Sequence, residues 1–133
     1  MKATKLLICG LITFAVFTFS VSAIASPEAS KGEHSVKAIA KILSHVNHFP
    51  SASEKKTLKK IAGDSSSPEH IRVIATAVSN MQHSVGSDDK SKLQAIAGDH
   101  GIDDDARTIA SILINFSHKP SKADKKKLGE ILE

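Results

Sequence analysis

Apolar residues recur over residues 34–46 at the three- and four-residue spacing that places side chains on one face of a helix. These positions are Val36, Ile39, Ala40, Leu43 and Val46. The pattern stops at Phe49-Pro50, since the residue before a proline is disfavoured in the α conformation. We therefore predict a long helix that begins near Glu33 or His34 and ends before Pro50.

A second, shorter helix is predicted to follow a tight turn. Ser51 and Glu54 have the spacing of a capping box, in which each side chain bonds the other residue's backbone N–H. Leu58 begins the apolar side of this helix. Gly63, and Gly98 further on, are predicted to end their helices in a positive-φ conformation.

This pattern of a long and a short helix is repeated at a spacing of 35 residues, because Ile61-Ala62-Gly63-Asp64 recurs as Ile96-Ala97-Gly98-Asp99. Several first-copy residues recur in both later copies: Ile39, Ala40, His48, Lys55, Leu58 and Ile61. A fixed period of 20–50 residues is typical of repeat architectures. In the second copy, Ser67 and Pro68 are predicted to be the N-cap and the first residue of the long helix.

The repeat predicts an all-α domain over residues 34–133, with units at about 34–66, 67–102 and 103–133. One hairpin is too small to bury a core alone, so neighbouring hairpins share theirs. The pattern favours six helices as three tandem hairpins stacked into a short α-solenoid-like arc, and the alternative is a compact six-helix bundle. In an arc, the middle unit is covered on both sides and the terminal units keep a polar face.

The first 25 residues have the features of a signal peptide. A short basic segment precedes an apolar run over residues 6–21, and Ala23-Ile24-Ala25 is a small-x-small cleavage pattern. We predict cleavage after Ala25, a flexible segment over 26–33, and a location in the periplasm or outside the cell. The alternative is an uncleaved membrane anchor. The one cysteine, Cys9, lies in this leader, so the mature chain would form no disulfide.

Composition disfavours nucleic-acid binding. The net charge of the whole chain is +4, and loss of Lys2 and Lys5 with the leader would lower it to about +2. Arg72 and Arg107 are the arginines, and the chain has no Trp or Tyr for base stacking. We predict another protein as the partner, with membrane association only through an uncleaved leader.

Lysines gather on the predicted short helices, where stacking would align them along one basic edge. Such an edge could bind an anionic surface, and acidic residues elsewhere suit a protein better than a polyanion. A solvated helix face is the alternative. The candidate partner-binding residues are Lys55, Lys56, Lys59, Lys60, Lys90, Lys92, Lys122, Lys125 and Lys126.

Histidine recurs in register at His48, His83 and His118, at the predicted C-terminal ends of the long helices. Helices that pack 8–10 Å apart in a row would keep these side chains from one ion, so we interpret them as helix-end residues. His45 and His48, three residues apart, are the candidate metal pair.

No catalytic motif is present: the sequence contains no G-x-S-x-G and no Gly-rich phosphate loop. We expect no enzyme activity and no cofactor. The leading hypothesis is an exported protein-binding or scaffold module. The alternative is a metal- or pH-responsive periplasmic factor that acts through its histidines, and a hydrolase of envelope polymers is a distant third.

Overall fold

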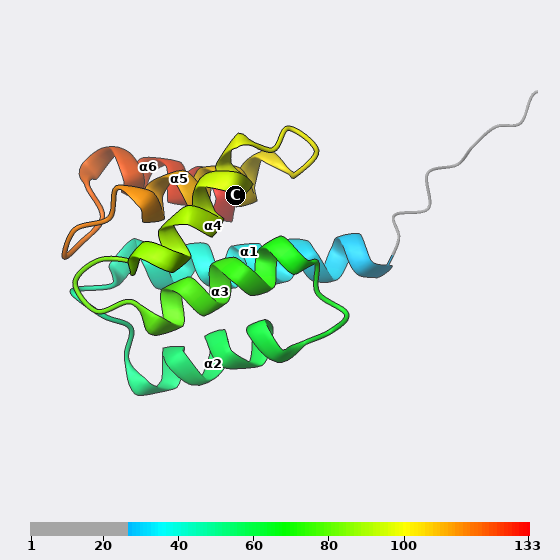
Figure 1. Ribbon diagram of the computed structural model, residues 1–133, viewed down its shortest axis with the longest axis horizontal. Helices are drawn as coiled ribbons and strands as arrows, with labels where there is room; N and C mark the ends of the chain where they lie inside the picture. The colour runs from blue at the N-terminus through cyan, green and yellow to red at the C-terminus, as the bar shows by residue number, and fades with distance from the viewer. Residues whose placement is uncertain (1–26) are drawn as a thin grey trace, which may run out of the picture.

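The computed structural model describes residues 27–133, which form six α-helices (Figure 1). They are α1 (Pro27–His45), α2 (Ala52–Gly63), α3 (Glu69–Asn80), α4 (Ser87–Gly98), α5 (Asp104–Ile114) and α6 (Lys122–Leu132). Over this range there is no strand, only two isolated β-bridges, so the all-α prediction is confirmed. None of these helices is both long and apolar enough to cross a membrane. The predicted signal peptide over 1–25 lies outside the described residues.

Each short helix packs mainly along the long helix of the next unit: α2 along α3, and α4 along α5 (Figure 1). The last short helix, α6, packs along the first long helix, α1, so the two ends of the repeat meet. The long helices α1, α3 and α5 also contact one another. The units therefore close around an approximate threefold axis, and the compact six-helix bundle, not the open arc, describes these contacts.

Equivalent residues in the three units are buried to the same extent. Ile39, Ile74 and Ile109, one from each long helix, are all 0% exposed. The same holds for the alanines that follow them and for the leucines of the short helices: Ala40, Ala75, Ala110, Leu58, Leu93 and Leu128. The expectation of a more covered middle unit is wrong, because closure supplies every long helix with the same kinds of neighbour.

The predicted capping box is confirmed at the start of α2, and α6 begins with the same motif. The Ser51 side chain accepts the backbone N–H of Glu54, and the Glu54 carboxylate accepts the backbone N–H of Ser51. Ser121 and Asp124 form the same pair. The start of α3 differs from the prediction, since Pro68 is its N-cap and no side chain caps it.

The predicted positive-φ glycines at the ends of α2 and α4 are wrong. Gly63 and Gly98 are the last helical residues, and no glycine in the described part of the chain has a positive φ. The chain leaves α2 in an extended conformation at Asp64 (φ −82°, ψ 101°), whose carboxylate accepts the backbone N–H of Ser66 at 3.0 Å. Such an aspartate turn replaces the glycine turn at this helix end.

Helix α1 begins earlier than predicted, at Pro27, so residues 27–33 are helical. Proline is well suited to a first helical turn. The Lys31 ammonium lies 3.1 Å from the Asp64 carboxylate and also donates to the Ser66 hydroxyl. Gly32 is buried, and a Cβ atom added at this position would lie 3.5 Å from Pro68 Cγ. The partners in these contacts lie between α2 and α3, far from α1 in the sequence, so the local pattern of residues 27–33 did not reveal them.

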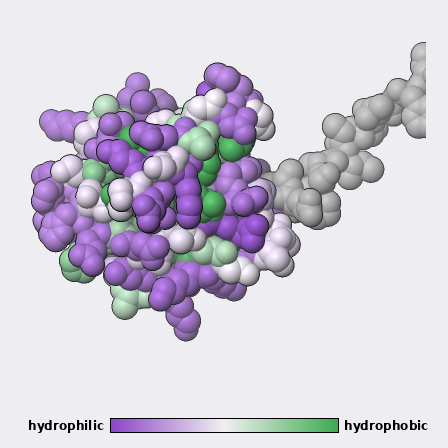
Figure 2. Space-filling model, in the orientation of Figure 1, coloured by the Kyte–Doolittle hydropathy of each residue, from purple (hydrophilic) through white to green (hydrophobic). Residues whose placement is uncertain are grey.

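The surface seen in Figure 2 is mostly hydrophilic, with hydrophobic residues in small separate areas. Among the described residues, the exposed large hydrophobics are Phe49 (55%) and Leu132 (38%). The apolar side chains of the repeat therefore lie almost entirely in the shared core.

Substitution of the three equivalent isoleucines tests the closed arrangement. Ile39→Ala, Ile74→Ala and Ile109→Ala should each lower the free energy of unfolding by about 2–5 kcal/mol, because each removes a fully buried side chain. The three losses should be similar, as measured by urea denaturation. Gln94→Ala, on the exposed side of α4, is the control and should change stability by less than about 0.5 kcal/mol. A much larger loss at Ile74 alone would support the open arc.

The pKa of Asp64 offers a second test. Hydrogen bonds from the Ser66 side chain and backbone, and then from Lys31, lower the pKa of Asp64 from 3.8 to about 2. Because the folded pKa is below the unfolded one, this stabilisation is present above about pH 4 and is lost as the pH falls through about 2. Ser66→Ala should raise the pKa toward 3.8, as followed by NMR of the Asp64 carboxyl carbon. The neighbouring Ser65→Ala should leave it unchanged, and an equal shift in both variants would contradict the assigned cause.

Candidate functional site

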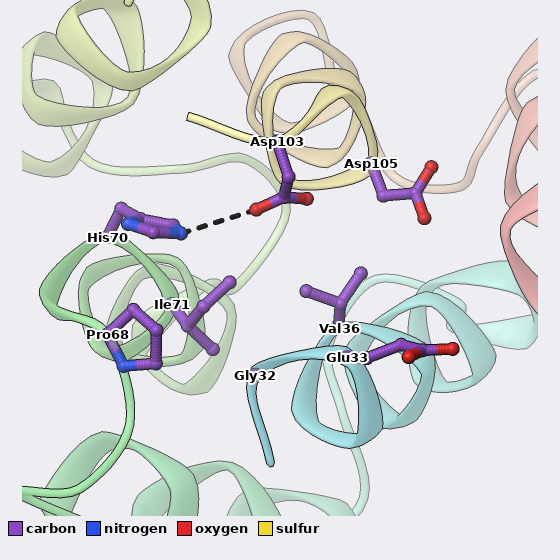
Figure 3. Close-up of a pocket in the computed structure, with 8 residues that line it drawn as sticks. All are labelled: Gly32, Glu33, Val36, Pro68, His70, Ile71, Asp103 and Asp105. Atoms are coloured by element: carbon purple, nitrogen blue, oxygen red, sulfur yellow. Dashed lines mark ion pairs between the residues drawn. The ribbon is translucent and has the colours of Figure 1, made fainter. Parts of the chain in front are cut away.

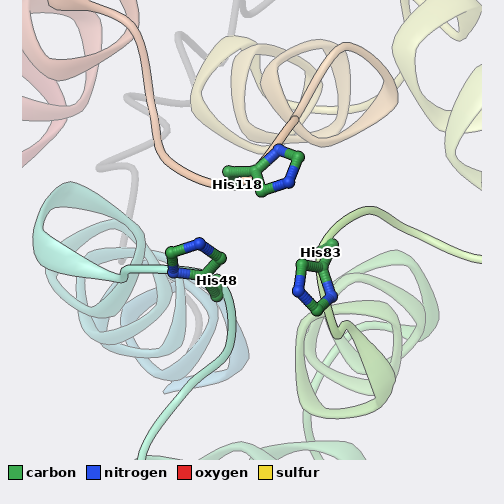
Figure 4. Close-up of side chains that lie close together, drawn as sticks. All are labelled: His48, His83 and His118. Carbon is green, nitrogen blue, oxygen red and sulfur yellow. The ribbon is translucent and has the colours of Figure 1, made fainter.

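Three histidines from the three units meet at one end of the bundle (Figure 4). His48, His83 and His118 follow α1, α3 and α5, and we call them the three-histidine group. Their ring centroids lie 5.3, 5.3 and 5.4 Å apart, and one ring nitrogen of each lies within 4.8 Å of the others. All three side chains are exposed to solvent. The three units of the repeat therefore each contribute one histidine to a single place on the surface.

The expectation that these histidines stay apart is wrong. It assumed helices in a row, in which the first and third are separated by the second. In a triangle, helices packed 8–10 Å apart lie only about 5 Å from the common axis. An imidazole from each of the three following loops can then reach the same point.

Two of the histidines have an unusual backbone conformation. His48 (φ 69°) and His118 (φ 64°) are the only non-glycine residues with positive φ in the described chain. The Phe49 N–H donates to the Asn47 carbonyl at 2.9 Å, and the Lys119 N–H to the Ser117 carbonyl at 2.7 Å. Each histidine is therefore the central residue of a γ-turn with positive φ, a rare and strained turn. Such strain is concentrated at functional sites.

A proline follows each γ-turn, and the third loop has no proline at the equivalent position. Pro50 and Pro120 are buried, and the equivalent residue after His83 is Val85. Pro50 was interpreted only as a helix terminator. The conformation of the histidines before the two prolines was missed, because it depends on how the loops pack.

Backbone hydrogen bonds hold the three loops together. The His48 N–H donates to the His118 carbonyl, and the His118 N–H donates to the His83 carbonyl at 2.8 Å. The Ser117 hydroxyl lies 3.0 Å from His118 Nδ1, which leaves Nε2 of that ring to face a ligand. The positions of the rings are therefore set by main-chain contacts as well as by the helices.

Three helices end and three begin at this end of the bundle. The C-terminal ends of α1, α3 and α5 precede the three histidines, and each helix end is equivalent to about −0.5 charge. The short helices begin at the same end, where each carries an acidic residue followed by a lysine: Glu54-Lys55, Asp89-Lys90 and Asp124-Lys125. These side-chain charges balance one another, and the N-termini of α2, α4 and α6, each equivalent to about +0.5 charge, offset the C-terminal ends of the long helices.

His45, a residue of the predicted metal pair, is engaged elsewhere. Its Nε2 lies 2.6 Å from the Glu54 carboxylate. A hydrogen bond from Ser51 is the main cause that lowers the pKa of Glu54, and His45 contributes further. His48 instead belongs with His83 and His118.

The candidate lysines do not form one edge. They lie on α2, α4 and α6, and these three helices do not contact one another within the described structure. Closure around an axis separates the short helices, whereas stacking would have aligned them. The lysines therefore form three separate patches, and their role in partner binding stays a prediction.

The three-histidine group has the donor set of a metal site. Imidazole is a preferred ligand of Zn²⁺, Cu²⁺ and Ni²⁺. Zn–N bonds of 2.0–2.1 Å in a tetrahedron need nitrogens about 3.3 Å apart, so each nitrogen would move inward by about 1 Å. Exposed side chains can rotate this far without disturbing the core. Three protein ligands leave a fourth position open to solvent.

No protein-family model, curated protein or solved structure matches this chain. The fold and the site define a closed six-helix bundle of three repeated units with histidines at its axis. The functional argument therefore depends on the geometry of that site.

Paired glycine and alanine substitutions test the strained turns. Both remove the imidazole, so their difference reports the backbone conformation alone. In metal-free buffer, His48→Gly and His118→Gly should be more stable than the alanine variants by about 1 kcal/mol, because glycine adopts positive φ without strain. At His83 the order should reverse, with alanine more stable by about 0.4–1 kcal/mol. Thermal unfolding measures each pair, and the same order at all three positions would contradict the assignment.

Proposed function

We propose that this protein binds a transition-metal ion through His48, His83 and His118, in an arrangement that suits the tetrahedral geometry of Zn²⁺. The observation that carries this proposal is the convergence of three exposed, repeat-matched imidazoles at the axis of the bundle. A tetrahedral ion takes three nitrogens from one side, and Zn²⁺ has no competing geometric preference. This proposal corresponds to the metal-responsive alternative from the sequence, with a different set of ligands.

Packing offers no other reason to keep histidine at these three positions. The residues on either side differ among the units, with Asn47, Gln82 and Ser117 before the histidines and Phe49, Ser84 and Lys119 after them. All three histidines are exposed, so core packing does not select them. Among the described residues, no ring nitrogen of the group donates to a helix carbonyl, which removes the main support for a capping role.

One bound ion would connect the three units. The contact of α6 with α1 closes the bundle without a covalent bond, and the sequence after residue 26 contains no cysteine. An ion at the axis would therefore cross-link the first and third units as well as the second. Because a ligand of the folded state stabilises it, an ion at 100 times its Kd would add about 2.7 kcal/mol to the free energy of unfolding.

The cellular location that we propose is the one predicted from the sequence. We propose that the protein is a non-enzymatic, exported factor of the periplasm or the secreted space. Its role there would be to bind or sense this ion. Protein binding through the lysine patches stays a separate prediction.

Metal titration tests the site directly. Calorimetry at pH 7.5 with Zn²⁺ should give one ion per chain, and Zn²⁺ should raise the melting temperature. His48→Ala, His83→Ala and His118→Ala should each weaken binding by more than about 100-fold, beyond the usual cost of losing an outer-shell partner. Cu²⁺ should bind more tightly than Zn²⁺, and Ni²⁺ should also bind.

His100→Ala and His45→Ala are the matched controls. Both remove an exposed histidine outside the three-histidine group, and both should leave the Zn²⁺ affinity unchanged. An absence of heat and of any melting shift would refute the proposal. Binding that is lost in the controls as fully as in the three variants would also refute it.

A further inference from the structure

A pocket of about 280 Å³ lies at the opposite end of the same axis (Figure 3). It is lined from all three units, by residues at the N-terminal parts of α1, α3 and α5. Glu33, Pro68 and Asp103 occupy equivalent positions in the 35-residue repeat, which places the pocket on the threefold axis. We call it the N-terminal pocket. It shares no residue with the three-histidine group.

The inner surface of the N-terminal pocket is apolar. Val36 and Ile71, at equivalent positions of α1 and α3, point toward its centre in Figure 3. The third equivalent residue is Ala106, so the layer of side chains below the pocket contains two large residues and one small one. Pro68 and Gly32 form an adjoining wall. Ala106 is smaller than Val36 and Ile71, and the space that a larger side chain would fill explains the hollow at this end.

The rim of the N-terminal pocket is acidic. Glu33, Asp103 and Asp105 contribute three carboxylates, and His70 is the one basic lining residue. His70 lies 3.4 Å from Asp103 across the pocket, and the Glu33 carboxylate lies 3.4 Å from Lys37. Asp105 has no ion pair within the described residues. Burial raises the pKa of Asp105, and the nearby Asp103 raises it further.

The helix ends do not reverse this charge. The N-termini of α3 and α5 face the pocket, and each is equivalent to about +0.5 charge, or about +1 together. With His70 neutral, the three carboxylates outweigh these two helix ends and the Lys37 ammonium beside Glu33. The site is therefore an apolar hollow under a field that attracts cations.

We propose that the N-terminal pocket binds a small organic cation with an apolar body, of the alkylammonium class. The alkyl chain would lie against Val36 and Ile71, and the ammonium group would lie at the rim beside Asp105. The pocket volume is close to the lower limit of about 300 Å³ for small-molecule sites, which favours a short chain. This proposal is independent of the metal site.

NMR titration of the metal-free protein with n-butylammonium tests the proposal, with n-butanol and butyrate as matched probes. The methyl signals of Val36 and Ile71 should shift with n-butylammonium. The shifts should be much weaker with n-butanol and absent with butyrate. Asp105→Asn should weaken n-butylammonium binding by about threefold to fivefold, as expected for one partly exposed charge contact.

Asp104→Asn is the control, because Asp104 is the next residue, lies outside the pocket and pairs with Arg107 at 2.6 Å. It should bind n-butylammonium as the parent does, and so should His83→Ala. Glu33→Gln provides a second rim variant if Asp105→Asn melts at a lower temperature. Equal binding of the three probes, shifts confined to other residues, or equal affinity in the Asp104 and Asp105 variants would overturn the proposal.

Discussion

The packing of α6 against α1 is the contact on which the rest of the structure depends. It brings the last unit against the first, so that α1, α3 and α5 each touch the other two. Both ends of this trio then become meeting points for equivalent residues. His48, His83 and His118 converge at the C-terminal end, and the N-terminal pocket forms at the other. Without closure, neither site would have its third contributor.

Much of the local structure could be predicted from the sequence, because it is determined by nearby residues. The apolar spacing predicted the long helices, and the Ser51–Glu54 pair predicted the start of α2. The 35-residue register predicted which residues share a buried environment, as Ile39, Ile74 and Ile109 do. Helix periodicity and capping act within a few residues of one another, so a single sequence contains the information they need.

Closure could not be predicted in the same way, because three units are too few for the hydrophobic pattern to distinguish an arc from a ring. The apolar surface of α1 has to be covered, and the sequence does not specify that α6 is the helix that covers it. The three-histidine group was therefore missed, although each of its residues had been noted. The early start of α1 was missed for a related reason, since Lys31 contacts Asp64 and Ser66 across a tertiary interface.

The two ends of the axis differ in how far the units have diverged, and the difference suits the proposed ligands. A metal ion takes the same donor from each unit, and histidine occupies all three positions at that end. An alkylammonium ion has no threefold symmetry, because one group is charged and the rest is apolar. At its proposed site the equivalent residues are Glu33, Pro68 and Asp103, which differ in charge and shape. A symmetric fold can thus present one symmetric and one asymmetric site, depending on which repeated residues remain identical.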